Sequence, residues 1–127
     1  MSAALTFVTP PPGLAPLTEF TLIPIDGAEG LYSLQAIQNH GTRLFVLDAA
    51  VYLPDYSPVF ADEQCAMLNL TVPDDALVLV VANPDEDGTT VNLMAPIVVN
   101  AATSVCAQVI LDGQDWPLRA ELGSRAA

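Results

Sequence analysis

The sequence predicts a mainly β, single-domain protein: a small antiparallel β-barrel-like fold with one short helix. Its 127 residues are enough for one hydrophobic core. Hydrophobic residues make up 52% of the chain, which indicates a globular protein even though it contains 11 prolines. The prolines and glycines divide the apolar segments into strand-sized lengths, and such frequent turn signals are typical of an antiparallel sandwich or barrel.

Three strands and an ordered loop are predicted in the first half of the chain. Residues 18–25 (TEFTLIPI) are rich in β-forming side chains and end near an Asp-Gly turn. Residues 31–37 (LYSLQAI) form the next strand. Residues 42–47 (TRLFVL) are apolar at both alternating positions, which predicts a strand buried on both faces. Residues 51–60 (VYLPDYSPVF) have the proline, aspartate and aromatic content of an ordered loop.

The helix is predicted over residues 61–70 (ADEQCAMLNL). Ala61, Cys65 and Leu68 recur at i, i+4 and i+7, which places them on one helical face. Two acidic residues follow Ala61 directly, at the end of a helix where negative charge is favourable.

Strands are predicted again in the second half of the chain. Residues 75–83 are apolar at both alternating positions, like residues 42–47. The segment PDEDG at residues 84–88 then forms a hairpin connection. Residues 104–111 carry apolar side chains at one set of alternating positions, as a half-buried strand does.

Residues 89–100 (TTVNLMAPIVVN) are predicted to form one long strand in spite of Pro96. The apolar alternation crosses the proline without a slip, so one continuous face is expected to carry Val91, Leu93, Ala95, Ile97 and Val99. Pro96 has no N–H to donate, so its position should face solvent or a gap in strand pairing.

Charge narrows the possible partners. Fifteen acidic residues stand against three arginines and no lysine, giving a net charge of -12. Direct binding to nucleic acid is therefore improbable, and so is docking on an anionic membrane. Either a basic protein partner complements this charge, or the charge only keeps a small apolar domain in solution.

The expected compartment is the cytoplasm. The first residues have neither a basic region nor an unbroken apolar run of the kind found in secretory signals, and no segment is long enough to span a bilayer. Cys65 and Cys106 are then expected to be reduced and buried, with a disulfide or a redox pair as the less favoured alternative.

Candidate catalytic groups are sparse, which predicts a binding protein without enzymatic activity, cofactor or metal. The one histidine, His40, lies in a turn-like QNHG segment. Residues 85–88 (DEDG) resemble part of a calcium loop but lack the later ligands at the required spacing. Asp74 and Asp75 fit the start of a strand better than a catalytic carboxylate pair.

Several segments, taken in order, resemble one known family. VNLMAPIVVN, QVIL and DWPLRAEL look like the C-terminal signature of the flagellar assembly factor FliW family, and LPDYSP resembles its Pro-Asp-Tyr loop. Similarity continues through DDALVLVVANPDEDGTTVNL and GLAPLTEFTLIPID, so that it runs from about residue 7 to residue 122. We therefore expect one FliW-like barrel domain over residues 1–122 and a flexible tail over residues 123–127.

The resemblance implies a regulator that exchanges partners. Such proteins bind CsrA, an RNA-binding repressor of translation, and relieve its repression of flagellin mRNA. Flagellin competes for the same factor, which also acts as its cytosolic chaperone. The free protein is expected to be a monomer. An alternative that the residues leave open is a barrel that binds a small apolar ligand in its interior.

Two departures from the family accompany the resemblance. The segment AATSVCA at residues 101–107 lacks the Lys or Arg that relatives commonly carry, so a contact that depends on those cations would be lost. Trp116 stands where tyrosine is common.

Six residues are predicted to contact the partners. They belong to the Pro-Asp-Tyr loop and to the outer face of the proline-containing strand: Pro54, Asp55, Tyr56, Asn92, Pro96 and Asn100. Two structural roles remain open as alternatives. Tyr56 would then cap the core, and the asparagine side chains would satisfy nearby backbone groups.

Overall fold

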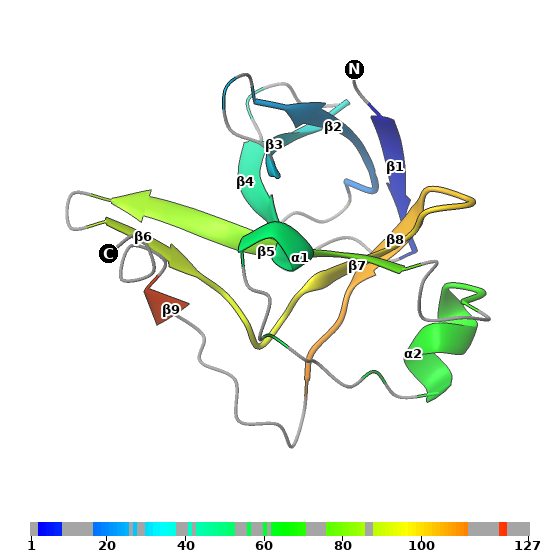
Figure 1. The fold of residues 1–127 in the computed structure, drawn as a ribbon. Coiled ribbons are helices and arrows are strands. Elements are labelled where there is room, and N and C mark those ends of the chain that lie inside the picture. Colours follow the sequence, from blue (N-terminus) through cyan, green and yellow to red (C-terminus); the bar gives the residue numbers. More distant parts are fainter. Residues whose placement is uncertain are drawn as a thin grey trace.

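A computed structural model describes the greater part of the chain (Figure 1). The described residues are 3–8, 17–25, 27, 30–37, 41, 43–52, 56, 60, 62–70, 76–85, 88–111 and 120–121. The strands are β1 (Ala3–Phe7), β2 (Glu19–Pro24), β3 (Leu31–Ala36), β4 (Arg43–Asp48), β5 (Ala76–Asp85), β6 (Gly88–Val91), β7 (Ile97–Asn100), β8 (Val105–Gln108) and β9 (Ala120–Glu121). The helices are α1 (Ala49–Tyr52) and α2 (Asp62–Met67).

Seven strands close into a barrel in the order β4-β3-β2-β1-β8-β7-β5, because β5 also pairs with β4. The described pairs are antiparallel except at one seam, where β1 runs parallel to β8 through Thr6–Val105 and Phe7–Cys106. The far half of β5 continues with β6 and β9 as an arm that extends away from the barrel (Figure 1). The predicted fold class, a mainly β barrel with little helix, is confirmed.

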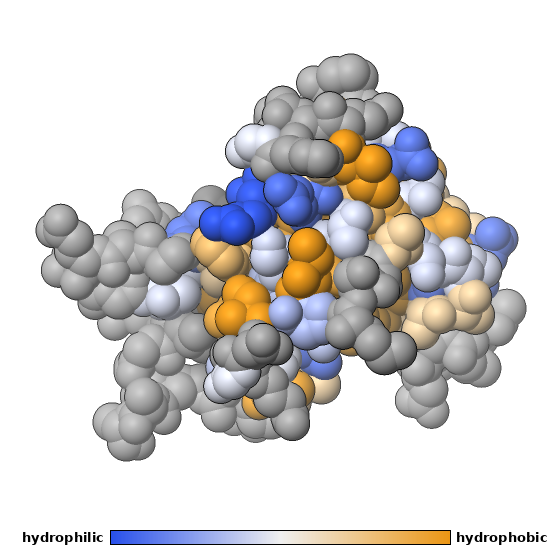
Figure 2. Space-filling view, turned by 90° about the horizontal axis from the view of Figure 1, so that it is seen from above, coloured by the Kyte–Doolittle hydropathy of each residue, from blue (hydrophilic) through white to orange (hydrophobic). Residues whose placement is uncertain are grey.

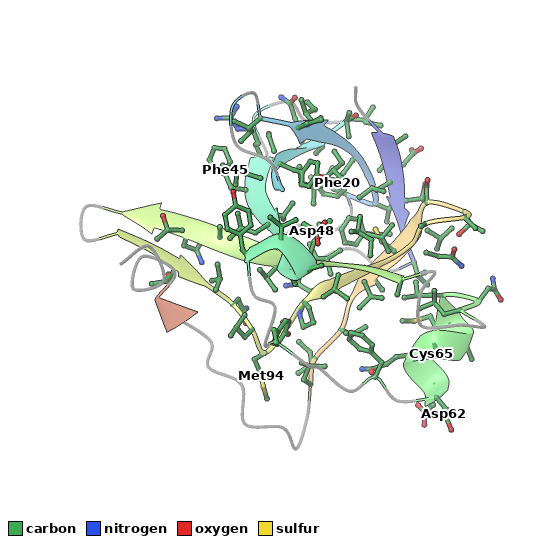
Figure 3. All side chains as sticks on the ribbon, viewed as in Figure 1. Phe20, Phe45, Asp48, Asp62, Cys65 and Met94 are labelled. Carbon is green, nitrogen blue, oxygen red and sulfur yellow. The ribbon has the colours of Figure 1, made fainter. Side chains whose placement is uncertain are left out.

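The barrel interior is filled by side chains of the chain itself. Phe7 and Phe20 meet edge to face inside it, with ring centroids 5.2 Å apart. Figure 3 shows Phe20 inside the barrel, whereas Phe45 lies outside it. The interior cluster consists of Leu5, Phe7, Phe20, Leu22, Leu34, Ala36, Val46, Leu79, Ile97, Val99 and Cys106.

Two further groups of buried side chains lie on the outside of the barrel. They explain why β4 and β5 are apolar on both faces, as their sequences predicted: Leu79 points into the barrel and Val80 points out. The first outer cluster, beside α1, is Leu47, Ala49, Val80, Ala82, Val91 and Leu93. The second outer cluster, beside α2, is Leu68, Val98, Ala107, Val109 and Leu111.

The helices differ in part from the sequence prediction. The helix predicted over residues 61–70 is present as α2, but α1 lies partly in the segment predicted to be a loop. Asp48 begins α1, because its Oδ1 accepts the N–H of Ala50 at 3.0 Å. Neither described helix is long and apolar enough to cross a bilayer.

The single long strand predicted over residues 89–100 is wrong. Residues 92–96 form a bend that separates β6 from β7. Pro96 is the last residue of the bend and is buried, so it lies in a gap in strand pairing rather than at solvent. The gap in pairing was expected from the missing N–H of Pro96. The expected continuity of the strand is contradicted by the bend.

The apolar alternation misled because it carries no information on the opposite strand. Val91 pairs with Ala82 and Ile97 pairs with Leu79, on the same edge of β5. Five residues, 92–96, therefore lie opposite two residues of β5, an excess of three. An odd excess reverses the faces. Val91 consequently joins the first outer cluster, whereas Ile97 points into the barrel.

Two positive-φ glycines give a matched test of how closely α1 packs. Gly30 has φ +84°, and a Cβ there would lie 3.0 Å from atoms of Val51 and Tyr52; Gly27 has φ +82° with nothing within 4 Å. Alanine at either position costs about 1–2 kcal/mol of backbone strain. Gly30→Ala should lower the free energy of unfolding by at least about 1 kcal/mol more than Gly27→Ala in urea titration, because it also overpacks α1. Equal losses would mean that α1 does not pack on Gly30.

Burial of Cys106 predicts a loss of stability at alkaline pH. Desolvation inside the barrel raises the pKa of the Cys106 thiol to about 12. A thiol in the unfolded chain ionises near pH 8.5, so the unfolded state loses this proton first. The stability that the neutral Cys106 thiol contributes is therefore fully present below about pH 8.5 and is lost as the pH rises toward about 12.

At pH 10 this effect should lower the free energy of unfolding by about 2 kcal/mol relative to pH 7. Urea titrations at both pH values should show the decrease in the wild type and in Cys65→Ser. The decrease should be smaller by about that amount in Cys106→Val. If Cys106→Val weakens as much as the wild type, another group causes the pH dependence.

Candidate partner-binding site

The structure brings together parts of the two predicted contact segments. Tyr56 donates a hydrogen bond from its hydroxyl to the carbonyl oxygen of Leu93, in the middle of the bend. Pro54 and Asp55 lie outside the described residues. Tyr56 and Asn92 are half-buried, while Asn100 is only 4% exposed. Tyr56, one of the described residues of the loop segment, is therefore joined to the bend.

The bend is held by side chains from three places in the chain. The Oδ1 atom of Asn92 accepts the N–H groups of Met94 and Ala95 at 3.0 and 3.2 Å. Gln108 donates from Nε2 to the carbonyl oxygen of Ala95 at 3.0 Å, while Tyr56 binds Leu93. These contacts satisfy backbone groups that lost their ladder partners where the excess residues left β5.

Backbone bonds from the segment after β8 complete the bend. The N–H of Val109 donates to the carbonyl oxygen of Pro96 at 3.0 Å, and the N–H of Leu111 donates to that of Met94 at 2.9 Å. The four successive carbonyls at residues 93–96 thus each accept a hydrogen bond. A bend with this many partners presents a fixed shape to a binding protein.

Tyr56 packs against both outer clusters as well as holding the bend. Burial raises the pKa of the Tyr56 hydroxyl above its ordinary value, so it remains protonated and able to donate at physiological pH. This position supports the structural alternative for Tyr56, that it caps the core. Direct contact with a partner stays a prediction for this residue.

Asn100 connects β7 to the end of α2. Its Nδ2 donates to the carbonyl oxygens of Leu68 and Asn69 at 2.8 and 3.4 Å, and its Oδ1 accepts the N–H of Ala102 at 2.9 Å. Its own carbonyl oxygen accepts the N–H of Ser104 at 2.8 Å. Asn100 therefore positions the helix and the β7–β8 turn, and its burial leaves little of it for a partner to touch.

α2 ends in a tight backbone cap. Leu70 donates to the carbonyl oxygen of Cys65 at 2.9 Å, and Asn69 has φ 55°, as a Schellman motif requires. In Figure 3, Cys65 lies on the side of α2 toward the barrel, and Asp62 projects from its far end. Gln64 donates to the carbonyl oxygen of Ile110 at 3.3 Å and fixes the other end of the helix.

Exposed apolar side chains were not part of the predicted site. On the face seen in Figure 2, above the barrel, they form small separate groups among hydrophilic residues. The large exposed apolar residues in the described part of the chain are Val8, Ile23, Ile37, Val51, Met67 and Ile110. Helical periodicity could have found Met67, which lies off the face of Ala61, Cys65 and Leu68. The short strand before Val8 gave no clear signal.

The family model described as FliW protein matches residues 1–122. The chain belongs to the FliW family. The resemblance noted in the sequence is thus confirmed over nearly the whole chain.

Similar proteins agree in sequence and in structure. A flagellar assembly factor FliW from Desulfitobacterium hafniense (strain Y51) is 32% identical over 117 residues, which are 91% of this chain and 77% of that protein. One from Shouchella clausii (strain KSM-K16) is 28% identical over 113 residues, 87% and 77% of the two chains. A crystal structure of the flagellar assembly factor FliW superposes with a TM-score of 0.87 at 25% identity, covering 94% of this chain and 84% of that one.

The two asparagines of this FliW chain give a matched test of the site. Asn100→Asp replaces an amide donor by a carboxylate that faces two carbonyl oxygens, whereas Asn92 uses only its Oδ1 in the bonds described above. Asn100→Asp should lower the free energy of unfolding by about 3 kcal/mol. Asn92→Asp should change it by less than about 1 kcal/mol, because a carboxylate still accepts both N–H groups. Urea titration at pH 7 measures both.

The pH dependence of the Asn100→Asp stability deficit distinguishes loss of the Nδ2 hydrogen-bond donor from a change in packing. The carboxyl introduced by Asn100→Asp should bind a proton more tightly in the folded state, because only its protonated form can donate. The deficit of Asn100→Asp in free energy of unfolding, relative to the wild type, should therefore shrink as the pH falls toward about 4. A deficit that is equal at pH 4 and pH 7 would contradict the assigned role of the Nδ2 donor.

Proposed function

We propose that this chain is a non-enzymatic flagellar assembly factor that binds two protein partners in turn. One partner is a CsrA-type RNA-binding regulator, whose repression of flagellin mRNA the chain relieves. The other is flagellin, which it escorts as a chaperone and which competes with the regulator. The observation that carries the proposal is the FliW family match over residues 1–122.

Electrostatics supports the regulatory half of the proposal. A protein of net charge -12 bound beside an RNA-binding surface repels phosphates over a Debye length, about 8 Å at physiological ionic strength. It can therefore weaken RNA binding without covering every RNA contact. The same field attracts a basic protein and speeds its association.

The bend and the Pro-Asp-Tyr loop are the proposed contact region. Pro54 and Asp55 precede Tyr56, which is tied to the bend through Leu93. Contacts are assigned to Pro54, Asp55 and the half-exposed Asn92. The other three also have positioning roles: Tyr56 and the buried Pro96 shape the bend, and Asn100 holds α2 in place, while their direct contact with a partner stays a prediction. Residues 101–107 supply no cation to this region.

Packing argues against the alternative of an apolar ligand inside the barrel. Eleven buried side chains, among them the Phe7–Phe20 pair, occupy the described interior. Interiors filled in this way resemble other protein cores, where side chains interdigitate at high density. We therefore favour recognition on the outer surface.

A competition experiment tests the proposal. A complex of the CsrA-type regulator of the source organism with its flagellin leader RNA is titrated with the purified chain and followed by electrophoretic mobility. The chain should release RNA from the regulator, and flagellin added in excess should restore the RNA complex. The chain saturated with flagellin beforehand serves as the control and should release none. If an excess of the free chain leaves the RNA complex intact, the regulatory role is wrong.

A further inference from the structure

We propose that two copies of this chain exchange their β1 strands, and that the proline-rich segment between β1 and β2 drives the exchange. In each barrel the slot between β2 and β8 is then filled by β1 of the other copy. The closed monomer and this exchange dimer are two assemblies of the same barrel, and the dimer carries two copies of the bend. The inference goes beyond the proposed function and does not rest on it.

β1 fills a slot that is shaped by its own side chains. Leu5 and Phe7 point into the barrel and are 3% and 2% exposed. Phe7 meets Phe20 of β2 edge to face, with ring centroids 5.2 Å apart. An identical strand from a second copy makes the same contacts in the same slot, so exchange loses no packing inside the barrel. The closed monomer and the exchange dimer differ in the path between β1 and β2, in charge repulsion and in the association of two chains.

One side of the slot is held by a short seam, where β1 lies beside β8 (Figure 1). β1 pairs with β2 at four positions but with β8 at only two, Thr6–Val105 and Phe7–Cys106. These two pairs are parallel, and parallel pairing is slightly less stable per residue than antiparallel pairing. Opening the barrel at β1 therefore breaks fewer strand pairs than opening it at β2, which pairs with β3 at five further positions.

The segment that joins β1 to β2 favours exchange. Residues 8–17 (VTPPPGLAPL) include four prolines, three of them consecutive at residues 10–12. Proline-rich chains prefer an extended backbone, in which ten residues would span about 30 Å. In the closed barrel, however, the N–H of Phe7 donates to the carbonyl oxygen of Thr18 at 2.8 Å, so the two ends of this segment lie side by side. A connection whose preference conflicts with its closed ends favours strand exchange, because it can run from one barrel to the other.

Net charge opposes the exchange dimer at low ionic strength. Two chains that each carry a net charge of -12 repel one another. Salt shortens the range of this repulsion from about 30 Å at 0.01 M to about 3 Å at 1 M. The ratio of exchange dimer to monomer should therefore rise with salt as well as with chain concentration.

Cysteines placed on β1 and β2 report which copy fills the slot. Ala4 faces Thr21 at a pair without direct hydrogen bonds, because Phe7 and Thr18 form a hydrogen-bonded pair and the two kinds alternate. Pairs of this kind are close enough for a disulfide. One chain carries Ala4→Cys and the other carries Thr21→Cys, both with Cys65→Ser. The two are mixed in urea, refolded together with oxidised glutathione and separated by nonreducing electrophoresis.

The mixture should give a covalent dimer, because the thiols introduced at positions 4 and 21 meet across two chains only after exchange. An increase of about tenfold in chain concentration during refolding should raise the ratio of this dimer to monomer by up to about tenfold, and salt near 1 M should raise it further. The control mixes Ala4→Cys with Gln35→Cys, since Gln35 is half-buried like Thr21 and pairs with it, but lies on β3, away from β1. A yield equal to that of the control at every concentration and salt would overturn the exchange.

A variant of the connecting segment tests whether the prolines drive the exchange. Replacement of Pro10, Pro11 and Pro12 by serine removes most of the preference for an extended backbone. In the same cysteine-bearing chains the yield of covalent dimer should fall several-fold, and thermal unfolding of the monomer should show that the barrel is retained. Pro24→Ser, outside the segment and exposed at the end of β2, should leave the yield unchanged. An undiminished yield from the triple serine variant would contradict the proposal.

Discussion

The pairing of one edge of β5 by two successive strands is the constraint on which the rest of the structure depends. β6 uses the far half of that edge and β7 uses the near half, and the bend at residues 92–96 absorbs the difference in length. Because the excess is odd, Val91 of β6 points outward, whereas Ile97 and Val99 of β7 point into the barrel. The base of the arm, at Ala82 and Val91, is therefore buried in the first outer cluster beside α1, while β7 completes the barrel.

The polar side chains around the bend follow from that constraint. A chain that leaves a ladder for five residues exposes backbone groups that need other partners. Tyr56, Asn92 and Gln108 supply some of them, and the segment after β8 supplies others. The proline of this chain is thus explained by geometry: Pro96 occupies a position at which no ladder N–H is required.

Much of the barrel could be predicted from the sequence, because strands buried on both faces and the hairpin at residues 85–88 leave strong local patterns. The break at the bend could not be predicted, because the alternation within one strand does not show how many residues of the neighbouring strand lie opposite it. Asn92 and Asn100 show the same limit at the site. They share a residue type and a parity, yet one shapes a half-exposed bend and the other is buried under α2. α1 and β9 are too short to produce a periodic signal.

The parallel seam between β1 and β8 delays closure of the barrel during synthesis. It joins residues about a hundred positions apart, so the barrel cannot close until almost all of its strands have been made. Contacts between distant residues form slowly compared with those of neighbouring hairpins. During synthesis at about 5–20 residues per second, the β1–β4 meander waits on the order of seconds for β8 to be made. For that interval the inward-facing apolar side chains of β1–β4 lack the partners that β7 and β8 supply, so they are open to contact with other chains.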